Sequence, residues 1–196
     1  MEPAHVDNWR KTLCRIGGDR LEHKRNGIVD LSYDGRAIAN YVLDRCDEGG
    51  RSLTHIPLQK VVYFCHVWSL IELKRPLVKH QFEAWPFGPV LQYLYREFKA
   101  FESAPIRKRA SQLDPRDGHW APVGYAFDPD TSALLAKTVD FYSRLSAADL
   151  VELSHVRGGP WDRVWNHTGT VNPGMKIPDW EIAEFYSRVR RPFAIQ

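Results

Sequence analysis

The chain has 196 residues, which is enough for one domain with a substantial core and small for two. Hydrophobic residues make up 43% and charged residues 26%, an ordinary globular composition that argues against disorder along the whole chain. The net charge of +3 is too small to indicate nucleic-acid binding by itself. Aromatic residues reach 12%. Because aromatic side chains anchor both cores and interfaces, the composition predicts a packed domain with a surface suited to macromolecular contacts.

The cysteines and the hydropathy pattern predict the compartment. Cys14, Cys46 and Cys65 form no CxxC or other close pair, and such a sparse, odd set argues against a disulfide framework and fits a reducing environment. No run approaches the about 18 apolar residues that a membrane span requires. The N-terminus lacks the basic-then-apolar order of a signal peptide. We therefore expect a cytoplasmic protein with no membrane partner.

The chain begins with a segment that has no clear apolar period. We expect residues 1–32 to form an N-terminal extension and residues 33–196 to form the domain. The first helix is expected over 35–47, because Asp34 is placed to cap its start and its apolar residues recur at helical spacing. A glycine pair follows, and glycine readily adopts the left-handed conformation that ends a helix.

The segment from Leu58 to Leu73 is the most apolar helix candidate. Thr54 and Pro57 precede and open it, and proline is tolerated in a first helical turn. Around a helix four of its polar residues fall within an arc of about 120°; they are Gln59, Lys60, His66 and Lys74. A helix that is apolar over most of its circumference belongs in the centre of a fold. We therefore expect this helix to be the core.

The chain then crosses a stretch from Leu77 to Phe87 that is expected to be extended. Gly88 and Pro89 predict the start of the next helix, with proline at its first helical position. Helical spacing places five apolar residues on one face of that helix: Leu91, Leu94, Tyr95, Phe98 and Phe101.

Residues 103–127 contain several prolines and glycines. This pattern predicts either a plain loop or a short β-hairpin with strands at 119–123 and 125–127. One further helix is expected at about 130–145, and a second follows a capping box at Ser146–Asp149. A short helical turn is expected at Trp161–Trp165, and the last helix begins at Asp179. The predicted fold is mainly α. It is a single-domain helical bundle around the central apolar helix, with or without a small β-hairpin near 119–127.

The spacing of reactive residues predicts no catalytic or metal site. The eight histidines include no HExxH motif and no pair three or four residues apart. Ser154 lies beside His155 and Cys65 beside His66, but neighbours on a helix point about 100° apart, so neither pair forms a nucleophile with its base. No phosphate-binding glycine motif is present. We expect a binding protein with no cofactor rather than an enzyme.

One cluster of aromatic and Gly-Pro residues stands out, from Phe82 to Val90. It predicts a sharp turn, for which two interpretations remain open. The turn either packs inward and delivers the chain into the following helix, or it presents aromatic side chains to a partner, and both can hold together.

Four groups of residues in this chain form a recognisable series. They are Tyr33 to Tyr41; Leu58-Gln59-Lys60 with Tyr63-Phe64; Glu83-Ala84-Trp85 with Gly88-Pro89-Val90 and Tyr95; and Leu150 to Ser154 with His155 and Pro160-Trp161. In this order and spacing, over residues 33–165, the chain resembles the Panacea domain, also called the SocA-like antitoxin domain. It departs from that family at Val61-Val62, where leucines are more frequent; the change stays apolar and should leave the fold intact.

The resemblance implies a mostly helical antitoxin that neutralises a cognate protein toxin by direct binding. One branch of the family hands its toxin to a cellular protease as an adaptor, and many members sit on prophages and other mobile elements. Some members carry an N-terminal DNA-binding domain, but residues 1–32 are too few and too weakly basic for a helix-turn-helix.

The partner-binding residues are predicted to come from the loop and helices that carry these motifs, because a few Trp, Tyr and Arg anchors usually supply most interface energy. They are Lys60, Trp85, Phe87, Tyr95 and Arg96. Core packing is an equally good interpretation for Trp85 and Tyr95. For Lys60 we expect a surface position or a pairing with a carboxylate such as Glu83, since burying an unpaired ammonium group is very unfavourable.

Two other functions compete with this one. A nucleic-acid-binding regulator of a mobile element would use the basic stretch 96–116 and the arginine-rich tail 188–191. A hydrolase would be built around His155 with Asp149 or Asp162.

Overall fold

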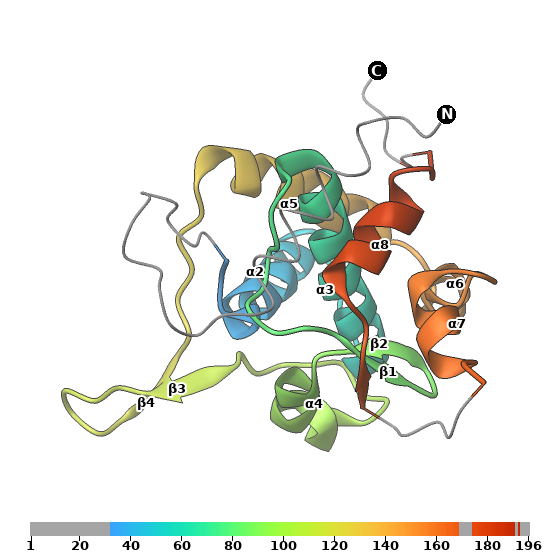
Figure 1. Cartoon of the computed structure of the whole chain (residues 1–196). Coiled ribbons are helices and arrows are strands. Elements are labelled where there is room, and N and C mark those ends of the chain that lie inside the picture. The colour runs from blue at the N-terminus through green and yellow to red at the C-terminus, as the bar shows by residue number, and fades with distance from the viewer. Residues whose placement is uncertain (1–31, 169–173, 191, 193–196) are drawn as a thin grey trace, which may run out of the picture.

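The computed structural model describes residues 32–168, 174–190 and 192. Within these residues the chain forms seven α-helices and two small antiparallel groups of strands, so the predicted mainly α class is confirmed (Figure 1). Apart from Ser32, the predicted N-terminal extension lies outside the described residues, and so does Cys14.

Helix α2, Gly35–Glu48, lies where the first helix was expected. Asp34 caps its start, because the side chain accepts a hydrogen bond of 2.8 Å from the backbone N–H of Arg36. The helix ends at Gly49, whose backbone N–H donates to carbonyls of the last turn. The apolar face of α2 is buried against the central helix.

Helix α3, His55–Trp68, is the centre of the fold, and a π-helical turn, Ser69–Leu73, continues it (Figure 1). Every residue of α3 except Ile56 is buried. Burial of one Val, Leu or Phe side chain contributes about 1.5–3 kcal/mol, so this helix is a main source of the fold's stability. The expected central apolar helix is confirmed. Its polar residues are buried as well: Gln59, Lys60 and His66.

A three-stranded antiparallel sheet packs beside α3, in the strand order β2-β1-β5. Its strands are β1, Glu83–Trp85; β2, Gly88–Val90; and β5, Met175–Lys176. Trp85 pairs with Gly88, so only Pro86 and Phe87 lie in the turn between β1 and β2. The chain therefore reverses direction within two residues.

The prediction that Gly88 and Pro89 open a helix is wrong. Gly88 has a φ of +96°, which is far from helical, and Pro89 pairs with Ala84 across the sheet. Proline lacks an N–H group, so it suits an edge strand such as β2 as well as a first helical turn. The helix itself is α4, Gln92–Phe98, with Leu91 at its N-cap position.

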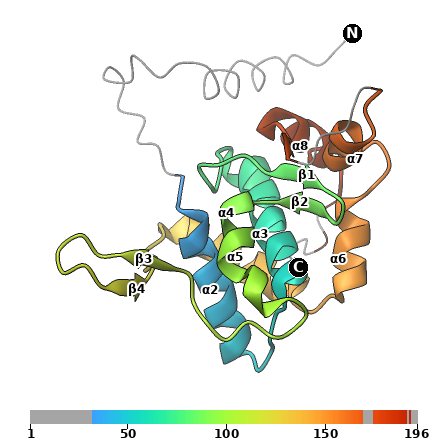
Figure 2. The same cartoon turned by 90° about the horizontal axis from the view of Figure 1, so that it is seen from below.

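Two further strands form an arm that projects from the body, as both ribbon views show (Figures 1 and 2). They are β3, Ser111–Leu113, and β4, Trp120–Pro122. The expected hairpin is thus present and β4 falls within its first expected strand, but the expected pairing with 125–127 is wrong. Tyr125 and Phe127 instead stack on each other, with ring centroids 5.5 Å apart, and both contact Tyr41 edge-on.

The C-terminal helices are α5, Pro129–Tyr142; α6, Ala147–Ser154; α7, Pro160–Trp165; and α8, Asp179–Tyr186. Helices α5, α6 and α8 pack on α3, and α7 packs on the sheet and on α8. The expected capping box is confirmed, because Ser146 and Asp149 each accept a hydrogen bond from the other's backbone N–H. Helix α5 is locked to α3 where the Tyr142 ring stacks on Phe64 at a centroid distance of 4.2 Å.

Candidate interaction surface

The turn between β1 and β2, residues Trp85–Gly88, places one aromatic side chain in solvent. Phe87 is 63% exposed, although it lies between strands that are largely buried. We call these four residues the Phe87 turn. An exposed phenylalanine at a tight turn is not needed for the core, so it is the first candidate for a contact with another molecule.

Side chains from three helical elements hold the backbone of the Phe87 turn in place. The indole N–H of Trp161 donates to the carbonyl of Trp85 over 2.9 Å. Lys60 Nζ donates to the carbonyl of Pro89, also over 2.9 Å. His155 Nε2 lies 3.4 Å from the carbonyl of Pro86, a long contact at the edge of hydrogen-bonding range. These contacts fix the turn before any partner arrives.

The strand that follows the turn is fixed in the same way. Gln59, one turn of helix before Tyr63, accepts a 3.0 Å hydrogen bond from the backbone N–H of Leu91 and donates to its carbonyl over 3.4 Å. A buried side-chain amide thus satisfies both backbone groups at the point where β2 passes into α4.

Gly88 makes this close packing sterically feasible. A Cβ atom at this position would lie 2.6 Å from Ser154 Oγ and 2.7 Å from Lys60 Nζ, distances that real Cβ atoms do not show. The positive φ of Gly88 also favours glycine over every L-residue. Both conditions explain why the turn carries glycine here.

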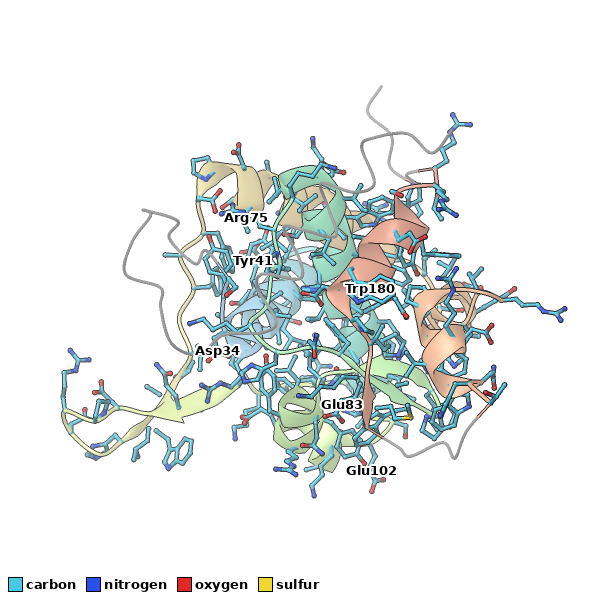
Figure 3. All side chains as sticks on the ribbon, in the orientation of Figure 1. Asp34, Tyr41, Arg75, Glu83, Glu102 and Trp180 are labelled. Carbon is cyan, nitrogen blue, oxygen red and sulfur yellow. The ribbon has the colours of Figure 1, made fainter. Side chains whose placement is uncertain are left out.

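Aromatic rings extend the surface from the Phe87 turn onto α3 and α4. The ring centroids of Trp85 and Tyr95 are 4.8 Å apart, and those of Tyr95 and His55 are 4.9 Å apart. The Trp85 indole N–H donates over 2.9 Å to Glu83, a residue that Figure 3 labels near α4. Trp85 and Tyr95 are half-buried, so each both packs and remains accessible.

Two basic groups lie beneath these rings. Lys60 is 1% exposed, and desolvation by burial lowers its pKa from 10.5 to about 7. His55 is 8% exposed; burial and then the charge of Lys60 lower its pKa. The expected surface position of Lys60 is therefore wrong. So is its expected pairing with Glu83, whose Oε2 accepts from Trp85 instead.

The five residues that we predicted to bind a partner differ in exposure and contacts. Phe87 and Arg96 are exposed, Trp85 and Tyr95 are half-buried with their rings 4.8 Å apart, and Lys60 is buried against the carbonyl of Pro89. Five residues were not predicted to shape the turn: Gln59, His155 and Trp161, which contact its backbone or that of the following strand, and Gly88 and Ser154, which pack closely together. All five occur in or beside the motifs of the resemblance, but nothing in their spacing says which carbonyl each one contacts.

The prediction that Ser154 and His155 point too far apart to form a hydrogen bond is wrong, because Ser154 Oγ lies 3.2 Å from His155 Nδ1. Both atoms also contact the carbonyl of Val151, and the two aspartates of the competing hydrolase are engaged elsewhere. Asp149 belongs to the capping box at the start of α6, at the opposite end of that helix from His155. Asp162 accepts from the backbone N–H of Gly158 and from the Asn166 amide, and these bonds hold the pKa of Asp162 below its usual range. Within the described part of the chain, no three or more His, Cys, Asp or Glu side chains form a group that could hold a metal ion.

The basic stretch 96–116 is neutralised in part by neighbouring carboxylates. Arg109 pairs with Asp44 and Asp47 of α2, and Arg116 pairs with Asp114 at the tip of the arm. Such pairing reduces the positive charge that would attract a phosphate backbone. No described helix has the length and apolar character to cross a membrane.

Comparisons with known proteins show which family the chain resembles. The family model described as "Antitoxin SocA-like, Panacea domain" matches residues 58–162, which contain the Phe87 turn and every side chain that holds it. Antitoxin SocA of Caulobacter vibrioides (strain NA1000 / CB15N) is 38% identical over 149 residues, which are 76% of this chain and 79% of that protein. No solved structure matches the chain. The chain belongs to the antitoxin SocA-like, Panacea domain family.

Proposed function

We propose that this protein is an antitoxin that neutralises a cognate protein toxin by direct binding and not by catalysis. Family membership and the 38% identity to a protein named antitoxin support the role. The observation that carries the binding mode is the Phe87 turn, where an exposed aromatic side chain stands on a backbone that other side chains already hold in place. A preformed contact loses little conformational entropy on binding, which favours affinity.

In this proposal the toxin docks on one face of the molecule. Phe87 inserts into the toxin, Trp85 and Tyr95 widen the aromatic contact, and Arg96 provides a charge at its rim. Lys60 contributes from below by holding the turn. We name this surface the turn face and define it by Trp85, Phe87, Tyr95 and Arg96.

The complex would form in the cytoplasm, where the buried free thiols of Cys46 and Cys65 would stay reduced. After binding, the toxin would be either held inactive or passed to a cellular protease. The two outcomes differ in one measurement, the lifetime of the toxin after synthesis stops. A bound toxin that is degraded faster in the presence of this protein indicates an adaptor, and a toxin that is protected indicates simple inhibition.

Co-expression tests the proposed function. Genes adjacent to the one for this protein are expressed singly and together with it. We expect one product to arrest growth alone, to allow growth in the presence of the antitoxin and to co-purify with it. Arg96→Glu should weaken rescue without unfolding the protein, and Arg116→Glu on the arm is the matched control. If no neighbouring product is toxic, bound or neutralised, the proposed function is wrong.

A further inference from the structure

Lys60 and His55 are two buried bases without an acidic partner. Lys60 Nζ has three hydrogens to donate, and one of them goes to the carbonyl of Pro89. No salt bridge of Lys60 or His55 with a described carboxylate is present, and His55 Nε2 has no hydrogen-bond partner among the described residues. Glu83, the carboxylate expected to pair with Lys60, is bonded to Trp85.

The burial of these two bases lowers the stability of the folded protein. The buried amine is not fully compensated for the desolvation of its charge, and the unsatisfied ring nitrogen of His55 is not compensated for its lost hydrogen bond to water. A methionine at position 60 and a phenylalanine at position 55 would fill similar volumes without either cost. Buried ionisable groups that lack a structural partner mark functional sites, because the missing partner can come from a ligand.

We propose that His55 and Lys60 form the base of a carboxylate-recognition site, and that the segment of the partner that docks on the turn face is acidic. This inference rests on the proposed function, since it specifies the chemistry of the toxin surface. The carboxylate accepts a hydrogen bond from protonated His55 at Nε2, and the ammonium group of Lys60 adds a second positive charge beneath it.

The route to His55 runs past Tyr95. The Tyr95 ring contacts the His55 ring edge-on at 4.9 Å, and it is itself only half-buried. In this proposal the Tyr95 side chain rotates away from the His55 ring when the partner docks, and such side-chain rearrangements are common when interfaces form. His155, the other titratable group beside Gly88, also presents a basic ring, and Arg96 is exposed next to Tyr95.

The charges around the turn face favour an acidic occupant over a basic or neutral one. A basic segment would further disfavour the protonated forms of His55 and Lys60, whose pKa values burial already lowers, whereas a carboxylate would favour those forms. A neutral apolar segment would leave His55 Nε2 unsatisfied. A carboxylate removes both penalties, and complementary charge of this kind also speeds the encounter of two proteins.

The direct test uses labelled hexaglutamate as the probe, with fluorescence anisotropy at low ionic strength and unlabelled hexaglutamine as the neutral competitor. The proteins are wild type, Lys60→Met, His55→Phe and the control Lys99→Met, which removes a positive charge from an exposed residue at the end of α4. We expect hexaglutamate to bind wild type and the control within about twofold of each other, and to lose at least about tenfold in affinity for the other two variants.

Lys60→Met separates recognition from folding, because it should make the protein more stable while it weakens binding. A loss of affinity in a more stable protein cannot come from unfolding. Absence of hexaglutamate binding to wild type, or equal affinity of wild type, Lys60→Met and His55→Phe, would overturn the inference.

The toxin assay separates this inference from the proposed function. A toxin that wild type and Lys60→Met bind equally well leaves the proposed function standing and overturns the carboxylate site. Hexaglutamate binding that depends on Lys60, in the absence of any toxic neighbouring product, supports the site and contradicts the proposed function.

Discussion

Lys60 illustrates at the scale of one residue how function and stability compete in this fold. Its side chain is buried on α3, while its amine donates a hydrogen bond to the carbonyl of Pro89 and so fixes the strand that follows the Phe87 turn. The difference between a pKa of 10.5 and one of about 7, at about 1.4 kcal/mol per unit, corresponds to roughly 5 kcal/mol that burial of the amine costs the folded state.

Lys60→Met should therefore change the pH dependence of stability. Between pH 7 and 10.5 the unfolded chain keeps the amine protonated while the folded protein does not, so the free energy of unfolding of wild type rises with pH in this window. At pH 7 the variant avoids the desolvation cost of the buried amine but loses the hydrogen bond to the carbonyl of Pro89. We therefore expect Lys60→Met to be more stable than wild type by about 2 kcal/mol. Near pH 10 it should be less stable by about 1 kcal/mol. Urea unfolding across this range, with Lys99→Met as the control, measures the crossing.

The close packing around Gly88 leads to a second prediction for a single residue. Gly88→Ala places Cβ within 2.7 Å of Ser154 Oγ and Lys60 Nζ and also strains the backbone, and we expect a loss of at least about 3 kcal/mol in the free energy of unfolding. Gly118 is the matched control: it too has a positive φ, of +72°, but nothing lies within 4 Å of its Cβ position. Gly118→Ala should lose only about 1 kcal/mol. Equal losses in the two variants would show that close contacts are not the reason why position 88 requires glycine.

Among the elements, the projecting arm depends on one buried side chain at its root. Asn40 of α2 donates to the carbonyls of Ala110 and Val123 and accepts from the N–H of Ala110, over 2.7 to 2.9 Å. The strands themselves are mostly exposed, and an isolated two-stranded ribbon is only marginally stable in water. The base of the arm is thus ordered by α2 together with the backbone bond from the N–H of Val123 to the carbonyl of Ala110.

Asn40→Ala should accordingly destabilise the protein strongly. The substitution leaves two buried backbone groups without a partner, the carbonyl of Val123 and the N–H of Ala110, whereas the carbonyl of Ala110 still accepts from the N–H of Val123. At about 1–3 kcal/mol for each group, we expect a total loss of about 2–5 kcal/mol in the free energy of unfolding. Trp120→Ala, on the exposed part of the same arm, should change stability by less than about 0.5 kcal/mol. Denaturant unfolding compares the two, and a larger effect of Trp120 than of Asn40 would contradict this account.

Helices were predictable from this sequence because their signals are local. The cap at Asp34, the capping box at Ser146 and the apolar run after Leu58 each lie within one element, and all three are confirmed. Strand β2 was missed because its determinants are distant. Whether Gly88 and Pro89 begin a helix or a strand depends on β1 and on the contacts with α3 and α6, which no window of neighbouring residues contains.

The candidate site was predictable only in part for the same reason. The aromatic cluster around Trp85 identified the turn, because exposed aromatic and Gly-Pro residues are informative in isolation. The burial of Lys60 could not be predicted, since a lysine on a helix is expected at the surface unless something far along the chain covers it. Here the cover is β2, almost thirty residues later: Lys60 and Pro89 are 29 positions apart.

At the scale of the whole molecule, the buried core supports the surface that we propose to bind the toxin. Helix α3 lies at the centre, and the same helix carries Gln59 and Lys60, which position the strand pair that bears Phe87. A displacement of α3 would therefore disturb the core and the turn face together. This coupling predicts that destabilising core variants also lose toxin binding, so a clean test of the turn face must use a side chain outside the core.

Phe87→Ala meets that condition. The ring is 63% exposed, so its removal should change the free energy of unfolding by less than about 0.5 kcal/mol, whereas removal of an aromatic anchor from an interface usually costs 2 kcal/mol or more, about 30-fold in Kd. Trp120→Ala is the matched control, because Trp120 is larger and more exposed, at 72%, but lies on the arm. Titration calorimetry with the purified toxin should show weaker binding for Phe87→Ala alone. If Trp120→Ala weakens binding and Phe87→Ala does not, the toxin docks on the arm, and the fixed turn serves only the fold.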